Sequence, residues 1–432
     1  MRRISLAAAI ALAPIAALLG PAPVDAQQER IQAEAQRNSC IRCHRVIDER
    51  RYSDPVREYV NDVHYSAGFG CVTCHGGDSR TLEKPRSKDP DLGYIGIPEI
   101  EDVPDLCARC HADPDFMKRY APGMRTDQMA RYRTSVHGRR LVELGDTKVA
   151  VCTSCHTAHA IRPADDPESS VHPPTVAETC GACHADSSYM AEFAIPTNQV
   201  DEYHRSVHWT MMEEGDLSAP TCNDCHGNHG AAPPEVEWVG AVCGQCHSAE
   251  EALFSLSGHP EAFVRLGRPG CAGCHGNHSI AQASDSMLGL KGGSLCVDCH
   301  EADEPEGKAA VAMRDLIEKL KLERHRSDSL LEAAEGAGLE VSQAMFELED
   351  ATNALVLARA NTHAAEVDSV RARVEEGLQI TGRAWERGKA AFRDLRNRRL
   401  GLAVSSGVIL LLIVGIVLKI REMEAEGGER DG

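Results

Sequence analysis

The sequence predicts a mainly α-helical protein with short helices and loops up to residue 300, then long helices, then one membrane-spanning helix. Nine Cys-x-x-Cys-His strings are separated by segments rich in Gly and Pro, which end helices early. From residue 305 to 400 there is no cysteine and little proline, and apolar residues recur at three- and four-residue steps. From 402 to 418 the chain is apolar and uncharged, near the lower limit for a membrane span.

All 18 cysteines belong to the nine strings, so none is left over for a disulfide. The spacing is that of c-type haem attachment, in which two thiols bond to one porphyrin edge and the adjacent histidine ligates the iron. Structural zinc would need Cys-x-x-Cys pairs combined in twos, without a histidine after each pair. Aromatic residues make up only 4% of the chain, which suggests that haems fill much of the core. The strings predict nine covalently bound haem c groups, attached through Cys40, Cys43, Cys71, Cys74, Cys107, Cys110, Cys152, Cys155, Cys180, Cys183, Cys222, Cys225, Cys243, Cys246, Cys271, Cys274, Cys296 and Cys299, with His44, His75, His111, His156, His184, His226, His247, His275 and His300 as proximal iron ligands.

Three further histidines follow a proximal histidine by three residues: His159, His229 and His278. A three-residue link is too short to carry the chain around the macrocycle to the opposite face. Each of these histidines is therefore expected to ligate the iron of a neighbouring haem. The alternative is a solvent-exposed or propionate-bonded histidine.

A second set of distal candidates lies upstream of a motif, and most of its members follow a Ser-x-His pattern. His204 competes with His208, and the Ser-Val-His context favours His208. His172, His325 and His363 are weaker candidates, because the first lies in a Pro-rich loop and the others in the helical tail. The sequence thus allows either complete bis-histidine coordination or one or two open irons. The members of this upstream set are His64, His137, His208 and His259.

The second motif is the candidate for an open iron. Its string continues as Gly76-Gly77-Asp78, where three later motifs carry a histidine. The alternative is that a histidine from a later module, such as His137 or His172, fills this position.

The two ends of the chain predict export and anchoring. Residues 1–26 have a basic start, an apolar stretch and a small residue before the cut, as in a signal peptide. We expect a haem domain at 27–300, amphipathic helices at 301–400, a transmembrane helix at 401–419 and a cytoplasmic tail at 420–432. Haem attachment occurs outside the cytoplasm, so the bulk should face the periplasm. The arginines between 393 and 399 conflict with the positive-inside rule.

The helical tail should form two or three long helices with a break at Gly336-Ala-Gly338. Their apolar faces are expected to pack on the haem domain or on a second copy, which would give a homo-oligomer. The alternative is a solvated stalk between the haem domain and the membrane.

These motifs resemble the multihaem cytochrome c superfamily, which includes cytochrome c3-like proteins, pentahaem nitrite reductase and octahaem hydroxylamine oxidoreductase. The resemblance covers roughly Asn38 to Leu400 and rests on the CHxxH strings, the Ser-Val-His segments and the long helices after the last motif. The chain has no CxxCK string, and nine haems match neither enzyme.

Nine closely spaced haems predict electron transfer between redox partner proteins, and the membrane anchor suits a quinol-oxidising or terminal reductase complex as the partner. The alternative is an oxidoreductase that acts on a small nitrogen or sulfur compound at one open iron. The formal net charge is −19 without a basic patch, so no nucleic-acid partner is expected.

Overall fold

A computed structural model describes all residues except 1–28, 30–32, 35, 235–238 and 429–432. The predicted signal peptide, residues 1–26, lies outside the described residues. Helices and loops make up the described part, which contains no strand, and the expected mainly α class is confirmed. The chain divides into two compact units, Met1–Pro233 and Pro234–Gly432.

The first unit consists of short helices joined by loops. The longest helix in the described part of this unit, α3, has 10 residues. The apolar clusters within it are small, such as Ile41, Val56 and Val60, so the protein side chains alone provide only a small core. Its helices are α2 (Ser39–His44), α3 (Arg50–Tyr59), α4 (Val63–Ser66), α5 (Cys71–His75), α6 (Lys84–Ser87), η1 (Pro90–Leu92), η2 (Ile100–Asp102), α7 (Val103–His111), α8 (Pro114–Tyr120), α9 (Gln128–Thr134), α10 (Val136–Leu144), α11 (Cys152–His156), η3 (Pro173–Thr175), α12 (Val176–His184), α13 (Ser187–Met190), η4 (Ala191–Phe193), α14 (Gln199–Tyr203), α15 (Val207–Glu213) and α16 (Cys222–His226).

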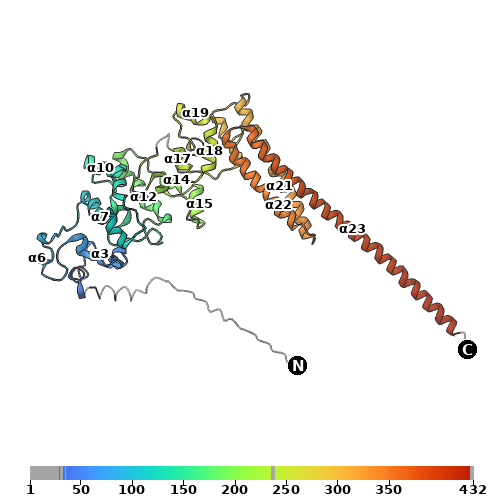
Figure 1. The fold of residues 1–432 in the computed structure, drawn as a ribbon, viewed down its shortest axis with the longest axis horizontal. Helices are drawn as coiled ribbons and strands as arrows, with labels where there is room; N and C mark the ends of the chain where they lie inside the picture. Colours follow the sequence, from blue (N-terminus) through green and yellow to red (C-terminus); the bar gives the residue numbers. More distant parts are fainter. Residues whose placement is uncertain (1–28, 30–32, 35, 235–238, 429–432) are drawn as a thin grey trace. The chain divides into compact units, whose positions relative to one another are not determined.

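The second unit combines short helices around three motifs with three long helices. Figure 1 shows the long helices α21, α22 and α23 running side by side. The helices of this unit are α17 (Val239–Cys243), α18 (Ser248–Leu256), α19 (His259–Leu266), α20 (Ala272–His275), η5 (Asp285–Met287), η6 (Cys296–Asp298), α21 (Pro305–Gly336), α22 (Ser342–Asn361), η7 (Thr362–Ala364) and α23 (Val367–Gly428).

The three long helices bury their apolar faces against one another. Ile317 and Leu320 of α21 and Val370 of α23 are fully buried in one of two core clusters. The packing is close at Gly377, where a Cβ atom would lie 2.7 Å from Leu320 Cδ1. Helix α21 ends at Gly336, inside the expected break. The three helices thus bury much of their amphipathic pattern against one another within this unit.

The boundary between the units lies well before residue 300, where the haem domain was expected to end. The last three motifs belong to the second unit because their helices pack on the bundle. Helix α18 contacts both η7 and α22. The Asp285 carboxylate also pairs with Arg359 of α22 and Lys321 of α21.

Helix α23 continues from the bundle into the apolar segment without a break. It has 62 residues, which corresponds to roughly 90 Å of helix. Within the described residues, one helix is long and apolar enough to cross a membrane, with a mean hydropathy of 2.7 in its most apolar window. Side chains such as Leu411 are exposed along this part.

Candidate haem sites

Each motif of the first unit lies on a helix that ends at its proximal histidine. The two cysteines are three residues apart, so both side chains project from the same face of one turn. The adjacent histidine follows at the carboxyl end of that turn. This is the geometry that attachment to one porphyrin edge requires. The six helices are α2, α5, α7, α11, α12 and α16.

The backbone conformation after the proximal histidine differs between even-numbered and odd-numbered motifs. After the second, fourth, sixth and eighth motifs, the next residue has a positive φ angle: Gly76 at 68°, Thr157 at 63°, Gly227 at 79° and Gly276 at 74°. Three of these are glycines, which adopt this conformation without strain. Thr157 is β-branched, so the surrounding fold must hold it there.

Three proximal histidines, His44, His75 and His226, use Nδ1 to contact a backbone carbonyl, which leaves Nε2 for a metal. His75 Nδ1 donates to the Gly96 carbonyl at 2.8 Å, and His226 Nδ1 donates to Ala232 at 3.2 Å. Such outer contacts orient the ring of a ligating histidine. Burial lowers the pKa of His156 and His184, which favours the neutral form that can bind iron.

Six proximal histidines have a second histidine ring across from them. Two imidazoles on opposite sides of one metal ion, with bonds of about 2 Å, place their ring centres roughly 6 Å apart. The observed distances match this value, so the side chains fit a bis-histidine iron. The ring-centre distances are 6.0 Å for His75–His159, 6.1 Å for His156–His229, 6.2 Å for His275–His363, 6.0 Å for His111–His64, 6.1 Å for His184–His137 and 6.2 Å for His300–His259.

The six pairs fall into two geometric classes that follow the alternation of the motifs. In the second, fourth and eighth motifs the two rings are nearly parallel, with interplanar angles of 17°, 14° and 28°. In the third, fifth and ninth motifs the angles are 81°, 53° and 74°. The parallel class includes the partners from CHxxH strings, and the tilted class contains the upstream histidines.

The Ser-x-His pattern places the distal candidate in the first turn of a helix. Ser135 is buried, and its Oγ accepts a hydrogen bond from Gly138 N at 2.9 Å, which caps α10 beside His137. Ser206 caps α15 in the same way through Trp209 N at 3.1 Å. The cap fixes the direction of the first turn and therefore of the histidine within it.

Asp62 performs this capping role for His64 and also joins two distant segments. Its Oδ1 accepts from the His64 backbone N–H at 2.8 Å and contacts His64 Nδ1 at 2.9 Å. Its Oδ2 accepts from Ile161 N at 2.8 Å, just after His159. Burial alone would raise the pKa of Asp62, but these hydrogen bonds outweigh it and lower the pKa. One ionised carboxylate thus positions two distal candidates.

His208 and His278 occupy the same places in the repeat as the paired histidines, and their ligand roles remain predictions. The competing residue His204 packs on Trp209, with ring centres 4.4 Å apart. Its Nε2 lies 3.5 Å from a Glu178 carboxylate oxygen.

His363, a weaker distal candidate by sequence, faces a proximal histidine in the structure. It lies in η7, between α22 and α23, with its ring across from His275. Its Nδ1 donates to the Ala360 carbonyl at 2.9 Å. The sequence held a signal for this residue. The second and fourth motifs each face the second histidine of a CHxxH string two motifs later. No CHxxH string follows the eighth motif, so its partner has to be another histidine farther along the chain.

The second motif does not have the open position that the Gly76-Gly77 string suggested. His159 lies across from His75, so a histidine from a later module occupies this side. A histidine from a later module was the alternative expected from the sequence, but the residue is His159 and not His137 or His172. The glycines instead fit a close approach, since a Cβ at Gly76 would lie 1.9 Å from the Gly93 carbonyl oxygen.

Neighbouring motifs lie close together in chain order within each unit. First cysteines are in contact between motifs one and two, three and four, five and six, and seven and eight. Second cysteines come close between motifs two and three and between motifs four and five. The eighth and ninth motifs also approach through Cys274 and Cys296. The motif edges therefore meet alternately through first and second cysteines.

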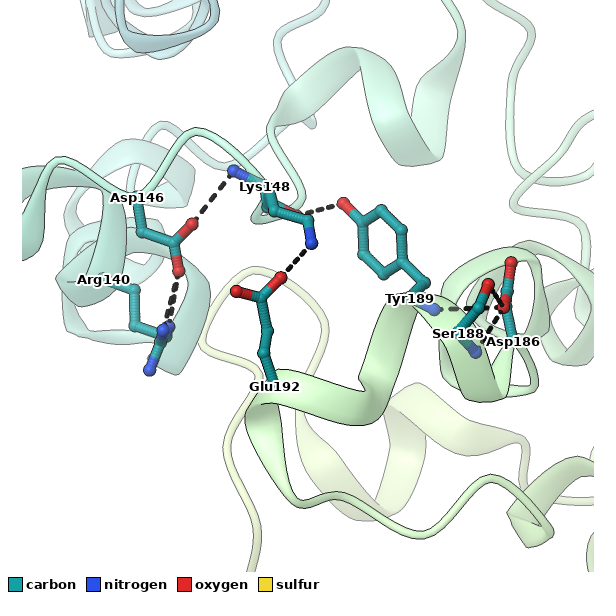
Figure 2. Close-up of polar contacts among 7 residues, drawn as sticks. All are labelled: Arg140, Asp146, Lys148, Asp186, Ser188, Tyr189 and Glu192. Atoms are coloured by element: carbon teal, nitrogen blue, oxygen red, sulfur yellow. Dashed lines mark hydrogen bonds and ion pairs between the residues drawn. The ribbon is translucent and has the colours of Figure 1, made fainter.

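Polar contacts hold the segment before the fourth motif against the segment after the fifth (Figure 2). Lys148 pairs with Glu192, and the Tyr189 hydroxyl donates to the Lys148 carbonyl oxygen. The Lys148 N–H donates to Asp146 Oδ1 at 3.0 Å, and Arg140 of α10 donates to Asp146 Oδ2 at 2.8 Å. These contacts keep α10, with its distal candidate, against the fifth motif.

The fold and its paired sites define a multihaem c-type cytochrome. The family model for cytochrome c3 matches residues 63–185, and that for the doubled CXXCH motif matches residues 265–305. The chain is 26% identical over 280 residues to the multiheme cytochrome MtrA of Shewanella baltica (strain OS185). The aligned part covers 62% of this chain and 66% of that relative, just under two thirds of its length. No solved structure matches significantly. These matches support the resemblance to the multihaem c-type cytochrome superfamily that the motifs indicate.

Proposed function

We propose that the protein carries electrons between respiratory redox partners through nine covalently bound haems, as a membrane-anchored cytochrome. The observation that carries this proposal is the contact of successive attachment motifs in chain order within each unit. Haem supplies one-electron chemistry, and the protein sets its position and electronics. The relative multiheme cytochrome MtrA supports a role of this class.

The side chains serve this role by keeping the paired sites rigid and ligated. Capping residues such as Asp62 and Ser135 hold the distal candidates in place, and backbone carbonyls hold the proximal rings. A site with two fixed histidine ligands needs no rearrangement of the chain when its charge changes. The redox partner is proposed to be a quinol-oxidising or terminal reductase complex.

The haem content is tested by whole-protein mass spectrometry of the mature protein. We expect nine haems per chain. A mass that corresponds to seven or fewer would contradict the assignment of the motifs.

The conduction path is tested by injecting an electron at one end. Because every native cysteine is used in a motif, a cysteine introduced at exposed Arg50 would carry a photosensitiser at a single place near the first motif. His229→Met would raise the potential of the fourth haem and make it an electron sink. After a light pulse, we expect the sink to be reduced.

Two haem-deletion variants provide the comparison. Cys71→Ala with Cys74→Ala removes the second haem and should strongly slow or abolish reduction of the sink. The matched control, Cys296→Ala with Cys299→Ala, removes the ninth haem and should leave the rate unchanged. Equal rates in both variants would contradict a path in chain order.

The apolar part of α23 is proposed to anchor the protein in the cytoplasmic membrane, with the haems on the periplasmic side. Truncation after Arg399 removes the segment of mean hydropathy 2.7 but keeps the bundle core. We expect a haem-loaded protein in the soluble periplasmic fraction. Retention in salt-washed membranes would show that another element anchors the chain.

A further inference from the structure

The first attachment site differs from the six paired sites. His44, at the end of α2, donates from Nδ1 to the Tyr52 carbonyl at 3.3 Å, which leaves Nε2 for the iron. The Tyr52 ring meets His44 edge-on, with ring centres 6.0 Å apart. All the histidines of the chain lie among the described residues, and within that part no histidine ring is in contact with His44. The first haem thus lacks the partner that six others have.

The unassigned histidines do not offer a replacement. His172 is buried, and its Nδ1 donates to the Ala164 carbonyl at 3.0 Å while Thr175 Oγ1 donates to the His172 carbonyl at 2.9 Å. This pattern closes a loop. His204 packs on Trp209. His325 is exposed on α21, in the second unit.

Burial separates His172 from the histidines that face a partner ring. His64 and His300, which face a partner ring, are partly exposed. His172 is only 9% exposed and is enclosed by protein atoms. It therefore has the surroundings of a structural histidine.

A positive charge lies beside the first motif. Lys88 is half-buried and follows α6 directly. Its ammonium group lies 5.7 Å from the centre of the Tyr94 ring and acts electrostatically on the Cys40 thiol and the His44 ring of this motif. An ammonium group near an iron favours anionic ligands over neutral ones of similar size.

We infer that the first haem has an iron position that no histidine of this chain fills and that binds a small anion. The inference rests on the proposed haem attachment, since His44 is its proximal ligand. It locates any small-molecule chemistry of this cytochrome at the first motif. Lys88 is a positioning residue that attracts the anion.

The test uses the full, haem-loaded protein with azide as an anionic probe and imidazole as a neutral one. Electron paramagnetic resonance of the oxidised protein should show one high-spin haem in nine, and one azide should bind per chain. His159→Ala is the positive control, because it opens the second site and should raise both counts to two. A count that stays at one in this variant would contradict the pairing on which the inference rests.

Two variants separate the alternatives. In His172→Ala the high-spin count should stay at one, and in Lys88→Gln the azide affinity should fall severalfold while imidazole affinity and stoichiometry stay the same. A wholly low-spin wild-type protein that ignores azide would overturn the inference. In that case, a new high-spin signal in one variant would identify His172 or Lys88 as the sixth ligand. Haem content by mass is measured on the same samples, so a failed attachment site is distinguished from a filled iron position.

Discussion

Replacing His363 with Met is expected to raise the reduction potential of one haem without loss of any haem. The thioethers of the eighth motif keep the cofactor attached, while the nitrogen ligand that faces His275 becomes a sulfur. Methionine ligation raises haem potentials. We expect a shift that is a sizeable part of the roughly 0.8 V over which axial ligands tune haem.

A potentiometric titration with spectral detection measures this shift. His325→Met is the matched control, because His325 is an exposed histidine of the same bundle, and its titration should equal that of the wild type. His363→Ala should instead convert one haem to high spin. An unchanged titration of His363→Met, together with no high-spin haem in His363→Ala, would show that His363 is not an iron ligand.

Asp285→Ala is expected to destabilise the second unit by about 1.5–3 kcal/mol, the usual contribution of a hydrogen bond to a charged group. Asp285 is 8% exposed and accepts from Arg359 Nε at 2.7 Å and Nη2 at 2.8 Å, and from Lys321 Nζ at 3.0 Å. The substitution leaves the partly covered Arg359 guanidinium without its partner. It also detaches the loop after the eighth motif from α21 and α22.

Denaturant unfolding followed by far-ultraviolet circular dichroism measures the loss. Asp394→Ala is the control, because the Arg398–Asp394 pair on α23 is exposed, and it should cost less than about 1 kcal/mol. Equal effects of the two substitutions would mean that the Asp285 network contributes no more than a surface pair.

The same network gives a pH dependence of definite sign. Hydrogen bonds from Arg359, then from Lys321, outweigh burial and lower the pKa of Asp285. A carboxyl whose folded pKa lies below its unfolded value of about 3.9 stabilises the fold above that pH. This contribution is lost as the pH falls from about 4 through the folded pKa. Asp285→Asn should remove this part of the acid dependence, which unfolding curves measured between about pH 3 and 6 would show.

Local patterns in the sequence determined most of the secondary structure. The Cys-x-x-Cys-His strings require only one helical turn, so the motif helices of the first unit follow from five adjacent residues. The apolar periodicity after residue 305 and the break at Gly336-Ala-Gly338 gave the long helices, because helix formation depends on neighbours three and four residues away. The expectation that the second histidine of a CHxxH string cannot ligate its own haem is local in the same sense, because it depends on a three-residue link.

Only the tertiary structure decided which histidines face each other and where the units divide. His159 and His363 lie far along the chain from His75 and His275, and no local pattern records which segments meet. The meeting depends on buried polar contacts such as Asp62 with Ile161 and on the packing of α18 against η7. The sequence thus determined the attachment motifs, whose geometry is set within one turn, while long-range packing decided which histidine rings face each other within each unit.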